Sequence, residues 1–475
     1  MVNAIFIIVI GLGTAFLLGL LRESWRQSAY YLTLAALTAM AWIAGRWLLY
    51  FAVDGGASVE IFTAGTEPPF AVNLRMGIAE AVLTLLVVMS GLLSAIYMKS
   101  TLLRLGRHIM AVLLVFTMAL CGVILTRDTF NLFVFLELSV IATAGLILLS
   151  NDKCAIAAGF KYLIISQFVT IFLLIGIFFA YHATGTFNID GMADSSLLML
   201  KGGSLAFFFM MMAVVIELKP FPANGWALDI YESAHPAFSA LFSAAMAGAA
   251  TIFAVDKLLL IGGQQWLPVV TVIGLLSFIA ANLLALSQNN DRRTLGYSSI
   301  GQVGLILTVV GQRDILGDNY LFIAGGILLS HAVAKAGLYW LSGLISQRDL
   351  TDWSALRGNP LLIFAFVSFI AMLSGLPPFP GFYAKWELIM TLAAEGRLWI
   401  IAGILMAVLL EAGYLFRWFG YVLKREKGKG EQDSQALFLQ SHKLAVVLST
   451  ALIGWSLAYL WGELSTYGNL LHALP

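Results

Sequence analysis

Apolar stretches about twenty residues long recur along the whole chain, and they constrain its fold more than any other feature. A helix needs about 20 apolar residues to cross a bilayer, and in lipid every backbone polar group must be bonded within the segment. Only 11% of the 475 residues are charged and 60% are hydrophobic, whereas about a quarter of a typical soluble protein is charged. The sequence therefore predicts an all-α, polytopic membrane protein.

Counting these stretches predicts fourteen transmembrane helices and leaves no soluble domain over. Two of the helices continue beyond a proline-rich break. The predicted spans are 4–21, 29–53, 77–98, 108–126, 129–150, 157–181, 204–219, 236–260, 267–287, 295–311, 319–346, 360–376, 398–423 and 442–462. The longest predicted loops are 54–76, 182–203 and 424–441.

Lys and Arg residues are divided unevenly between the two sets of connecting loops. Sixteen lie on one side and six on the other, the six including Arg127 and Lys257. Cytoplasmic loops carry the excess of basic residues, so the sequence predicts a cytoplasmic (inner) cell membrane protein with both termini on the outer, periplasmic side. The net charge of +1 gives no indication of a nucleic-acid partner.

Two similar stretches place helix-breaking prolines next to ionisable residues. "VVIELKPFPANGW" (214–226) and "LPPFPGFYAKW" (376–386) share a Pro-Phe-Pro break, a basic residue and a tryptophan. Irregular backbone at membrane depth is tolerated where it is buried in protein or lines a wet cavity, and transporters use paired broken helices in this way. The predicted helix-breaking residues are Pro220, Pro222, Pro377, Pro378 and Pro380.

Several ionisable residues lie inside the predicted spans. A charge at the bilayer centre costs about 2.5–3.5 kcal/mol even on lenient scales, so such residues are expected to face one another or a hydrated path. The candidate proton-relay residues are Glu137, Glu217, Lys219, His331, Lys335, Lys385 and Glu411, with Lys161 and Glu387 as secondary candidates.

Glu137 and His331 also have structural interpretations. Glu137 is either a relay carboxylate, a member of a structural ion pair, or a protonated carboxylic acid with a hydrogen-bond partner. His331 and Lys335 are four residues apart and so share one helix face. Histidine titrates near physiological pH, but His331 is equally explained as a neutral side chain bonded to a backbone carbonyl.

Alternatives remain for the other candidates too. Lys385 is a proton-carrying lysine, with Glu387 as a possible ion-pair partner, or it snorkels to the interface. Glu411 is a relay terminus connected to Lys385, or an ordinary helix–helix contact. Snorkelling is the first interpretation for Lys161. No phosphate loop, CxxC or HExxH motif is present, so no metal site and no cofactor are expected.

Four segments together resemble a known family. They are "RDTFNLFVFLELSVIATAGLIL", "NDRRTLGYSSIGQVGLIL", "HAVAKAGLYWLSG" and "SGLPPFPGFYAKWEL". The chain resembles, from about residue 75 to 425, the antiporter-like subunits of respiratory complex I, of Mrp cation/proton antiporters and of membrane-bound hydrogenases. The resemblance implies that Glu137, His331, Lys335 and Lys385 belong to a central line of proton-conducting charges.

The resemblance also implies a division of the chain. It gives N-terminal helices 1–3 (1–107), a first five-helix unit (108–260), a second five-helix unit (267–424), and a cytoplasmic loop with a final helix (425–475). The two five-helix units are inverted repeats, each with one broken helix.

The chain departs from the family pattern at its first break. Counting back from Trp226 puts Glu217, not Lys219, at the usual lysine position, and Asn224 replaces the usual histidine. On a regular helix Glu217 and Lys219 would point in different directions, about 100° of rotation separating successive residues. Either Lys219 substitutes through a local shift or the first half-channel no longer conducts.

The sequence therefore predicts an ion-translocating subunit of a multisubunit membrane complex. It would move protons, with exchange for sodium left open, and be driven by a partner redox module or an ion gradient. One alternative is a structural or coupling subunit with a non-conducting first half-channel. Another is a membrane partner of an inorganic-carbon uptake system.

Overall fold

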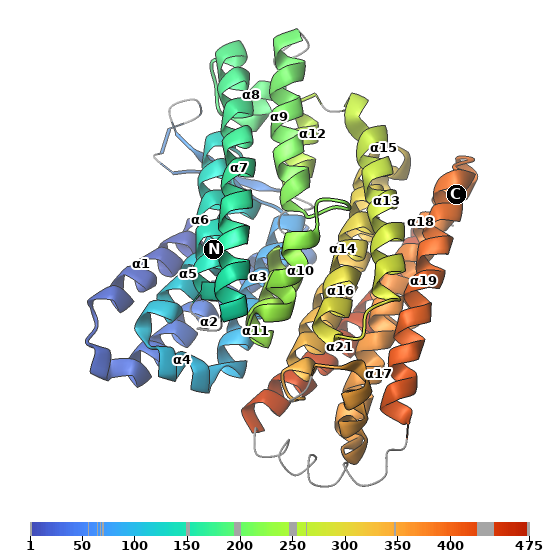
Figure 1. The fold of residues 1–475 in the computed structure, drawn as a ribbon. Coiled ribbons are helices and arrows are strands. Elements are labelled where there is room, and N and C mark those ends of the chain that lie inside the picture. The colour runs from blue at the N-terminus through green and yellow to red at the C-terminus, as the bar shows by residue number, and fades with distance from the viewer. Residues whose placement is uncertain are drawn as a thin grey trace. The chain divides into compact units, whose positions relative to one another are not determined.

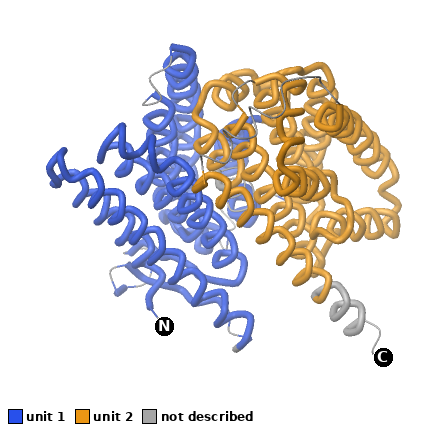
Figure 2. The backbone as a smooth tube through the Cα atoms, turned by 90° about the horizontal axis from the view of Figure 1, so that it is seen from below, with its two compact units in different colours: residues 1–219, 245–267 blue, residues 220–244, 268–475 orange. Residues whose placement is uncertain are grey.

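The chain folds into a set of long helices with one small sheet (Figure 1). The computed structural model describes all residues except 1, 56, 64, 67, 69–70, 149–152, 194–200, 247–253, 263, 346–347, 425–440 and 473–475. The chain divides into two compact units, Met1–Lys219 with Ala245–Leu267 and Pro220–Ala244 with Pro268–Pro475 (Figure 2). The predicted boundaries at 107, 260 and 424 stay predictions.

Unit 1 contains the N-terminal helices. Helix α7 packs along α9, α5 packs against α1 and α6, and α2 packs against α3. Its elements are α1 (Ile5–Leu20), α2 (Arg26–Asp54), β1 (Val59–Phe62), β2 (Asn73–Met76), α3 (Ile78–Tyr97), α4 (Lys99–Leu105), α5 (Arg107–Leu125), α6 (Thr129–Leu148), α7 (Lys153–Thr184), α8 (Ile189–Ala193), α9 (Lys201–Glu217) and α12 (Asp256–Leu260).

Unit 2 is built around the long buried helix α16. This helix contacts α11, α14, α17, α18 and α21. The elements are α10 (Gly225–Ser233), α11 (Pro236–Leu241), α13 (Leu267–Ala285), α14 (Asp291–Val310), α15 (Arg313–Leu316), α16 (Tyr320–Ser342), α17 (Pro360–Ser374), α18 (Pro380–Ala394), α19 (Leu398–Leu423) and α21 (Ser441–His472).

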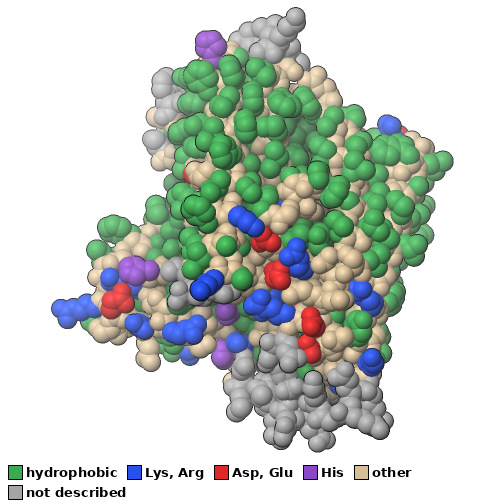
Figure 3. Space-filling model, viewed as in Figure 1, with side chains coloured by type: hydrophobic (Ala, Val, Ile, Leu, Met, Phe, Trp, Pro, Cys, Tyr) green, Lys and Arg blue, Asp and Glu red, His purple; other side chains and the backbone are tan. Residues whose placement is uncertain are grey.

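The helices carry the hydrophobic surface expected of membrane spans. Among the described residues, nine helices are long and apolar enough to cross a membrane, and Ile5–Leu20, Gly203–Glu217 and Pro360–Ser374 are shorter apolar helices. Large apolar side chains such as Phe168 and Leu409 are 63% and 74% exposed. Hydrophobic side chains cover much of the face in Figure 3. The predicted multi-pass membrane protein agrees with this surface, since a soluble monomer rarely exposes so much contiguous apolar area.

One small sheet lies within a segment that was predicted as a loop. Residues 54–76 were predicted as a loop, but β1 and β2 form an antiparallel pair within it, with Val59 opposite Met76 and Phe62 opposite Asn73. The paired segments are four residues each. Such short strands have too little alternation of apolar and polar residues to be recognised by pattern.

Both predicted helix breaks are present. Helix α9 ends at Glu217 and α10 begins at Gly225; α17 ends at Ser374 and α18 begins at Pro380. Pro380 occupies the first turn of α18, where its missing N–H costs no helical hydrogen bond. Each break therefore leaves the last carbonyls of the preceding half-helix without helical partners.

Close helix packing in unit 2 depends on small residues. A Cβ atom added to Gly274 on α13 would lie 2.5 Å from the backbone nitrogen of Thr308 on α14, and one added to Gly304 would lie 2.6 Å from the carbonyl oxygen of Gly274. Small residues let membrane helices approach this closely. The contact aligns α14, which carries one of the polar residues described next.

Candidate functional site

The first break brings Glu217 and Lys219 together. Lys219 has a φ of +62°, a left-handed conformation that costs a non-glycine residue about 1–2 kcal/mol. The turn directs its ammonium back along the chain, so that Nζ donates to the carbonyl oxygen of Glu217 at 3.1 Å and lies 3.9 Å from Oε1 of the same residue. A regular helix would have separated these side chains, so the break creates the pair.

Two hydroxyl groups on α7 hold the Glu217 carboxylate. Tyr162 donates to Oε1 at 3.1 Å and Ser166 donates to Oε2 at 3.1 Å. Tyr162 and Ser166 are 0% exposed and Glu217 is 5% exposed. The Lys219 ammonium also lies 5.9 Å from the centre of the Tyr162 ring. Each carboxylate oxygen therefore has one hydroxyl donor, and Oε1 also faces the lysine.

Glu137 lies close to this cluster but has its own partner. Gln167 of α7 donates an amide N–H to Glu137 Oε1, while Oε2 is buried with no hydrogen-bond partner among the described residues. The charge of Glu137 acts on Glu217. Lys161, in contrast, is exposed on the outside of α7, as a snorkelling lysine would be, so its side chain lies outside the buried cluster.

The second break holds a buried ion pair in unit 2. Lys385 of α18 places Nζ 3.5 Å from Glu411 Oε2 on α19 and 3.4 Å from the carbonyl oxygen of Ser374. Gln302 of α14 donates to Glu411 Oε1 at 2.6 Å. The side chains of Lys385 and Glu411 are 11% and 1% exposed. Gly375, with a φ of +74°, leaves room for the lysine stem, because a Cβ there would lie 3.0 Å from Lys385 Cδ.

His331 and Lys335 are buried on α16 in the same unit. Their exposed fractions are 1% and 0%. Lys335 Nζ donates to the carbonyl oxygen of Leu295 on α14 at 2.9 Å. Neither ring nitrogen of His331 bonds to another side chain in the described part of the chain, while the charges of Lys335 and Lys385 act on the ring. A buried imidazole without a side-chain partner is able to bind a water molecule.

The remaining secondary candidate lies outside this cluster. Glu387 accepts a hydrogen bond from Asn319 Nδ2 at 2.9 Å, and the carboxylate paired with Lys385 is Glu411. Within the described ranges, no three His, Cys, Asp or Glu side chains are grouped so that they could hold a metal ion.

The two breaks share one arrangement. In each, a lysine ammonium binds the last carbonyl of the half-helix before the break, Glu217 in α9 and Ser374 in α17, and also pairs with a glutamate. The negative end of a helix dipole favours a cation there. Lys219 precedes the prolines of its break and Lys385 follows those of the other. The shared binding of a half-helix carbonyl and a glutamate is therefore visible in the backbone but not in the sequence positions.

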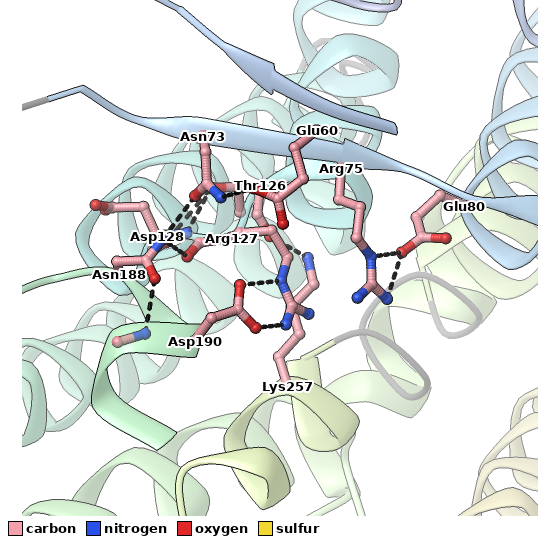
Figure 4. A network of polar contacts seen from close by, with 11 residues as sticks. Glu60, Asn73, Arg75, Glu80, Thr126, Arg127, Asp128, Asn188, Asp190 and Lys257 are labelled. Carbon is pink, nitrogen blue, oxygen red and sulfur yellow. Dashed lines mark hydrogen bonds and ion pairs between the residues drawn. The ribbon is translucent and has the colours of Figure 1, made fainter. Parts of the chain in front are cut away.

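A buried lysine at one end of unit 1 is not among the residues predicted from the sequence. Lys257, at the end of the predicted span 236–260, was counted among the basic residues of the connecting loops, but it is 2% exposed. Its Nζ donates to the carbonyl oxygens of Val123, Ile124 and Thr126 at 2.8, 2.9 and 2.5 Å. These carbonyls lie at the C-terminal end of α5, whose dipole favours a cation (Figure 4). Because Lys257 lies near the end of a span, it was interpreted as solvated. No local sequence signal distinguishes a solvated lysine at a span end from a buried one.

Further ion pairs surround Lys257. Arg127 is 2% exposed and binds Asp190 through two nitrogens, and Arg75 lies 3.1 Å from Glu80 Oε1 (Figure 4). These contacts fasten the connection between α5 and α6 to α8, and β2 to α3. They form a polar end to unit 1 that is separate from the Glu217 cluster.

Tyr162, Ser166, Gln167 and Gln302 were also missed. All four are polar residues within apolar helices, and that is the one sequence signal that could have found them. Serine and glutamine are common in membrane helix packing, so the signal is not specific without their partners.

The fold and the buried ion pairs define a class: polytopic membrane proteins that hold charge at broken helices. The family described as "NADH:quinone oxidoreductase/Mrp antiporter, TM" matches residues 126–410, which is more than half of the chain. The chain belongs to this family, as its motifs indicated, and it is an antiporter-like, ion-translocating membrane subunit.

Individual relatives agree with this assignment. The chain is 30% identical over 438 residues to an NADH-quinone oxidoreductase subunit from Desulforudis audaxviator, covering 87% of this chain and 85% of the relative. It is 30% identical over 327 residues to a Na(+)/H(+) antiporter subunit from Alkalihalophilus pseudofirmus, covering 66% and 65%. Its fold is similar to a chain of the Mrp complex from Dietzia sp., with a TM-score of 0.83 and 22% identity over 97% of this chain and 94% of that one.

Proposed function

We propose that this chain moves protons across the membrane through the buried charges at its two helix breaks. The observation that carries the proposal is the position of Lys385. Its ammonium lies between the end of a half-helix and the Glu411 carboxylate, almost out of contact with solvent. A buried ion pair is weak evidence for stability, because replacing it with apolar residues often costs nothing. Ionisable groups inside a membrane mark ion pathways by default.

Each lysine–glutamate pair can exchange one proton. Transfer from the Lys385 ammonium to Glu411 breaks an N–H bond, forms an O–H bond and leaves both groups neutral. Protonation of the amine from one side and deprotonation of the acid toward the other would then move one charge through unit 2. Glu217 and Lys219 provide the same chemistry in unit 1, with Glu137 beside them. His331 and Lys335 extend the buried charge along α16.

The number of transmembrane helices, their repeat topology and their orientation in the membrane are also part of this proposal. Fourteen helices, inverted five-helix repeats and termini on the periplasmic side are supported by the apolar spans, by the two matching breaks and by the sixteen-to-six distribution of basic residues. A path that crosses the membrane requires two half-channels of opposite orientation, which an inverted repeat supplies.

We also infer that the chain works beside other membrane subunits. A relative named as an NADH-quinone oxidoreductase subunit and another named as an antiporter subunit support this. A redox module or an ion gradient would supply the free energy. The antiporter relative's name supports sodium as an exchanged ion. Purification of the chain in mild detergent with its co-purifying subunits distinguishes a redox partner from an antiporter assembly or a carbon-uptake partner.

Vesicles that contain the complete complex test the proposal. We expect Glu137→Gln to reduce formation of a pH gradient at least tenfold while the complex assembles normally. Lys161→Ala is the control, because Lys161 is an exposed residue on the outside of α7. Wild-type proton movement in assembled Glu137→Gln would refute a relay role for this residue.

One observation favours a second candidate function, a coupling subunit with an inactive first half. Lys219 binds the carbonyl and the carboxylate of Glu217, two residues before it, as a structural ion pair does. Glu217→Gln and Lys219→Ala distinguish the two. Wild-type translocation in both variants would favour the coupling subunit, and a loss in either favours a conducting first half.

A further inference from the structure

We propose that Tyr162 and Ser166 are positioning residues for Glu217, which keep its carboxylate ionised beside Lys219 so that the pair exchanges a proton. This inference rests on the proposed function, because it assumes that unit 1 conducts. It concerns a glutamate at the position where the sequence pattern led us to expect a lysine. Neither hydroxyl group belongs to the motifs described above.

The geometry of α7 supports this role. Tyr162 and Ser166 are four residues apart and so lie on one helix face. Their hydroxyls donate to different oxygens of the same carboxylate, each at 3.1 Å. All three residues are buried. Because hydrogen bonds donated to a carboxylate favour its charged form, the two hydroxyls offset part of the cost of burying that charge.

Tyr162 also has a second partner for its hydroxyl. Thr143 of α6 lies within its hydrogen-bonding reach, and the Thr143 hydroxyl itself donates to the carbonyl of Ser139. When the proton of Lys219 moves to Oε1 of Glu217, Tyr162 can turn its O–H toward Thr143 and accept from the new acid. One N–H bond breaks, one O–H bond forms, and the pair becomes neutral. In the ionised pair the Tyr162 hydroxyl donates to the carboxylate, whereas in the neutral pair it only accepts from the acid, so it stabilises the ionised state more.

Other charged groups near Glu217 do not replace these donors. Glu137 on α6 repels the carboxylate, and Lys219 attracts it from the break. On the described part of α7, Tyr162 and Ser166 donate to it, and the charged Lys161 is exposed. Helix α12, which also packs on α9, carries Lys257, whose ammonium binds the carbonyls of α5. Loss of the two hydroxyls should therefore change the proton affinity of Glu217 directly.

Infrared spectroscopy of the purified full-length chain in lipid nanodiscs measures this without any translocation. The carboxylic C=O band that Glu217→Gln removes reports the protonated form of Glu217 as pH is varied. We expect Tyr162→Phe combined with Ser166→Ala to move the midpoint of this band to higher pH by about one to two units, and each single change by about half as much.

Tyr30→Phe is the matched control. Tyr30 is a buried tyrosine of unit 1 whose hydroxyl donates to the carbonyl of Ala95 and to no carboxylate, so its removal should leave the midpoint unchanged. An unchanged midpoint in the Tyr162/Ser166 double variant would overturn the inference. So would the absence of any titrating band that depends on Glu217. Wild-type pumping by Lys385→Ala complexes would instead overturn the proposed function and leave the infrared result standing.

Discussion

The Lys385–Glu411 pair should show a large energetic coupling in a double-mutant cycle. At 3.5 Å, two unit charges attract by about 5 kcal/mol at an effective dielectric constant of about 20, before desolvation is subtracted. Polar contacts in membrane helices average only about 0.6 kcal/mol in such cycles, because the unfolded state in the membrane finds other partners. A buried charge pair should exceed this average, and we expect about 1–3 kcal/mol.

The perturbations are Lys385→Met, Glu411→Gln and both together. Glu411→Gln keeps an oxygen for the amide of Gln302 but removes the charge facing Lys385, and it should cost about 3 kcal/mol, since breaking a buried pair leaves an uncompensated ammonium. The double variant should cost less than the sum of the single variants. The assay is reversible unfolding of the purified chain in mixed micelles, followed by tryptophan fluorescence.

Glu387 provides the control for this cycle. It lies two residues from Lys385 but binds Asn319, so Glu387→Gln and Lys385→Met should be additive within about 0.5 kcal/mol. A coupling below about 0.5 kcal/mol for Lys385 and Glu411 would refute the expectation that the two side chains interact as a buried charge pair.

Three other changes have expected outcomes in the same unfolding assay. Gly274→Ala should destabilise the chain by about 1–3 kcal/mol, because the added Cβ would meet the backbone of α14; Gly420→Ala, where nothing lies within 4 Å, should be neutral. Lys257→Met should cost about 2–3 kcal/mol, since the α5 carbonyls lose their donor, and a cost below about 0.5 kcal/mol would contradict the buried position. Burial raises the pKa of Asp128, which lies between α5 and α6. Its stabilising contribution is therefore present below about pH 3.9 and is lost as pH rises through the raised pKa. In thermal-unfolding measurements across this rise in pH, Asp128→Asn should gain stability relative to wild type. The same pH dependence in both proteins would contradict this.

Much of the fold was predictable because bilayer thickness sets the helix length. The predicted span 398–423 coincides with α19, and 129–150 begins with α6 at Thr129 and passes into residues outside the described ones after Leu148. The proline breaks were predictable because proline removes a donor and clashes with the preceding turn. The hairpin within 54–76 was not, because four-residue strands carry almost no pattern.

The candidate site was only partly predictable. Costly charges in apolar spans identified Glu137, Lys385 and Glu411, but their partners depend on how neighbouring helices are rotated. No sequence rule predicts that Gln302, and not Glu387, contacts the Lys385–Glu411 pair. The approach of Lys219 to Glu217 depends on the left-handed backbone conformation of Lys219. Lysine seldom adopts this conformation, so counting positions along the sequence assumes a regular helix there.

Proton translocation per driving event in vesicles tests the central claim most directly. The complete complex carrying Lys385→Ala is compared with wild type at equal assembly, and protons moved are counted against turnovers of the driving reaction or against the imposed gradient. We expect fewer protons per event in the variant, because the lysine between the half-helix carbonyl and Glu411 is missing. An unchanged number of protons per event would contradict the claim that the buried charges of unit 2 carry protons.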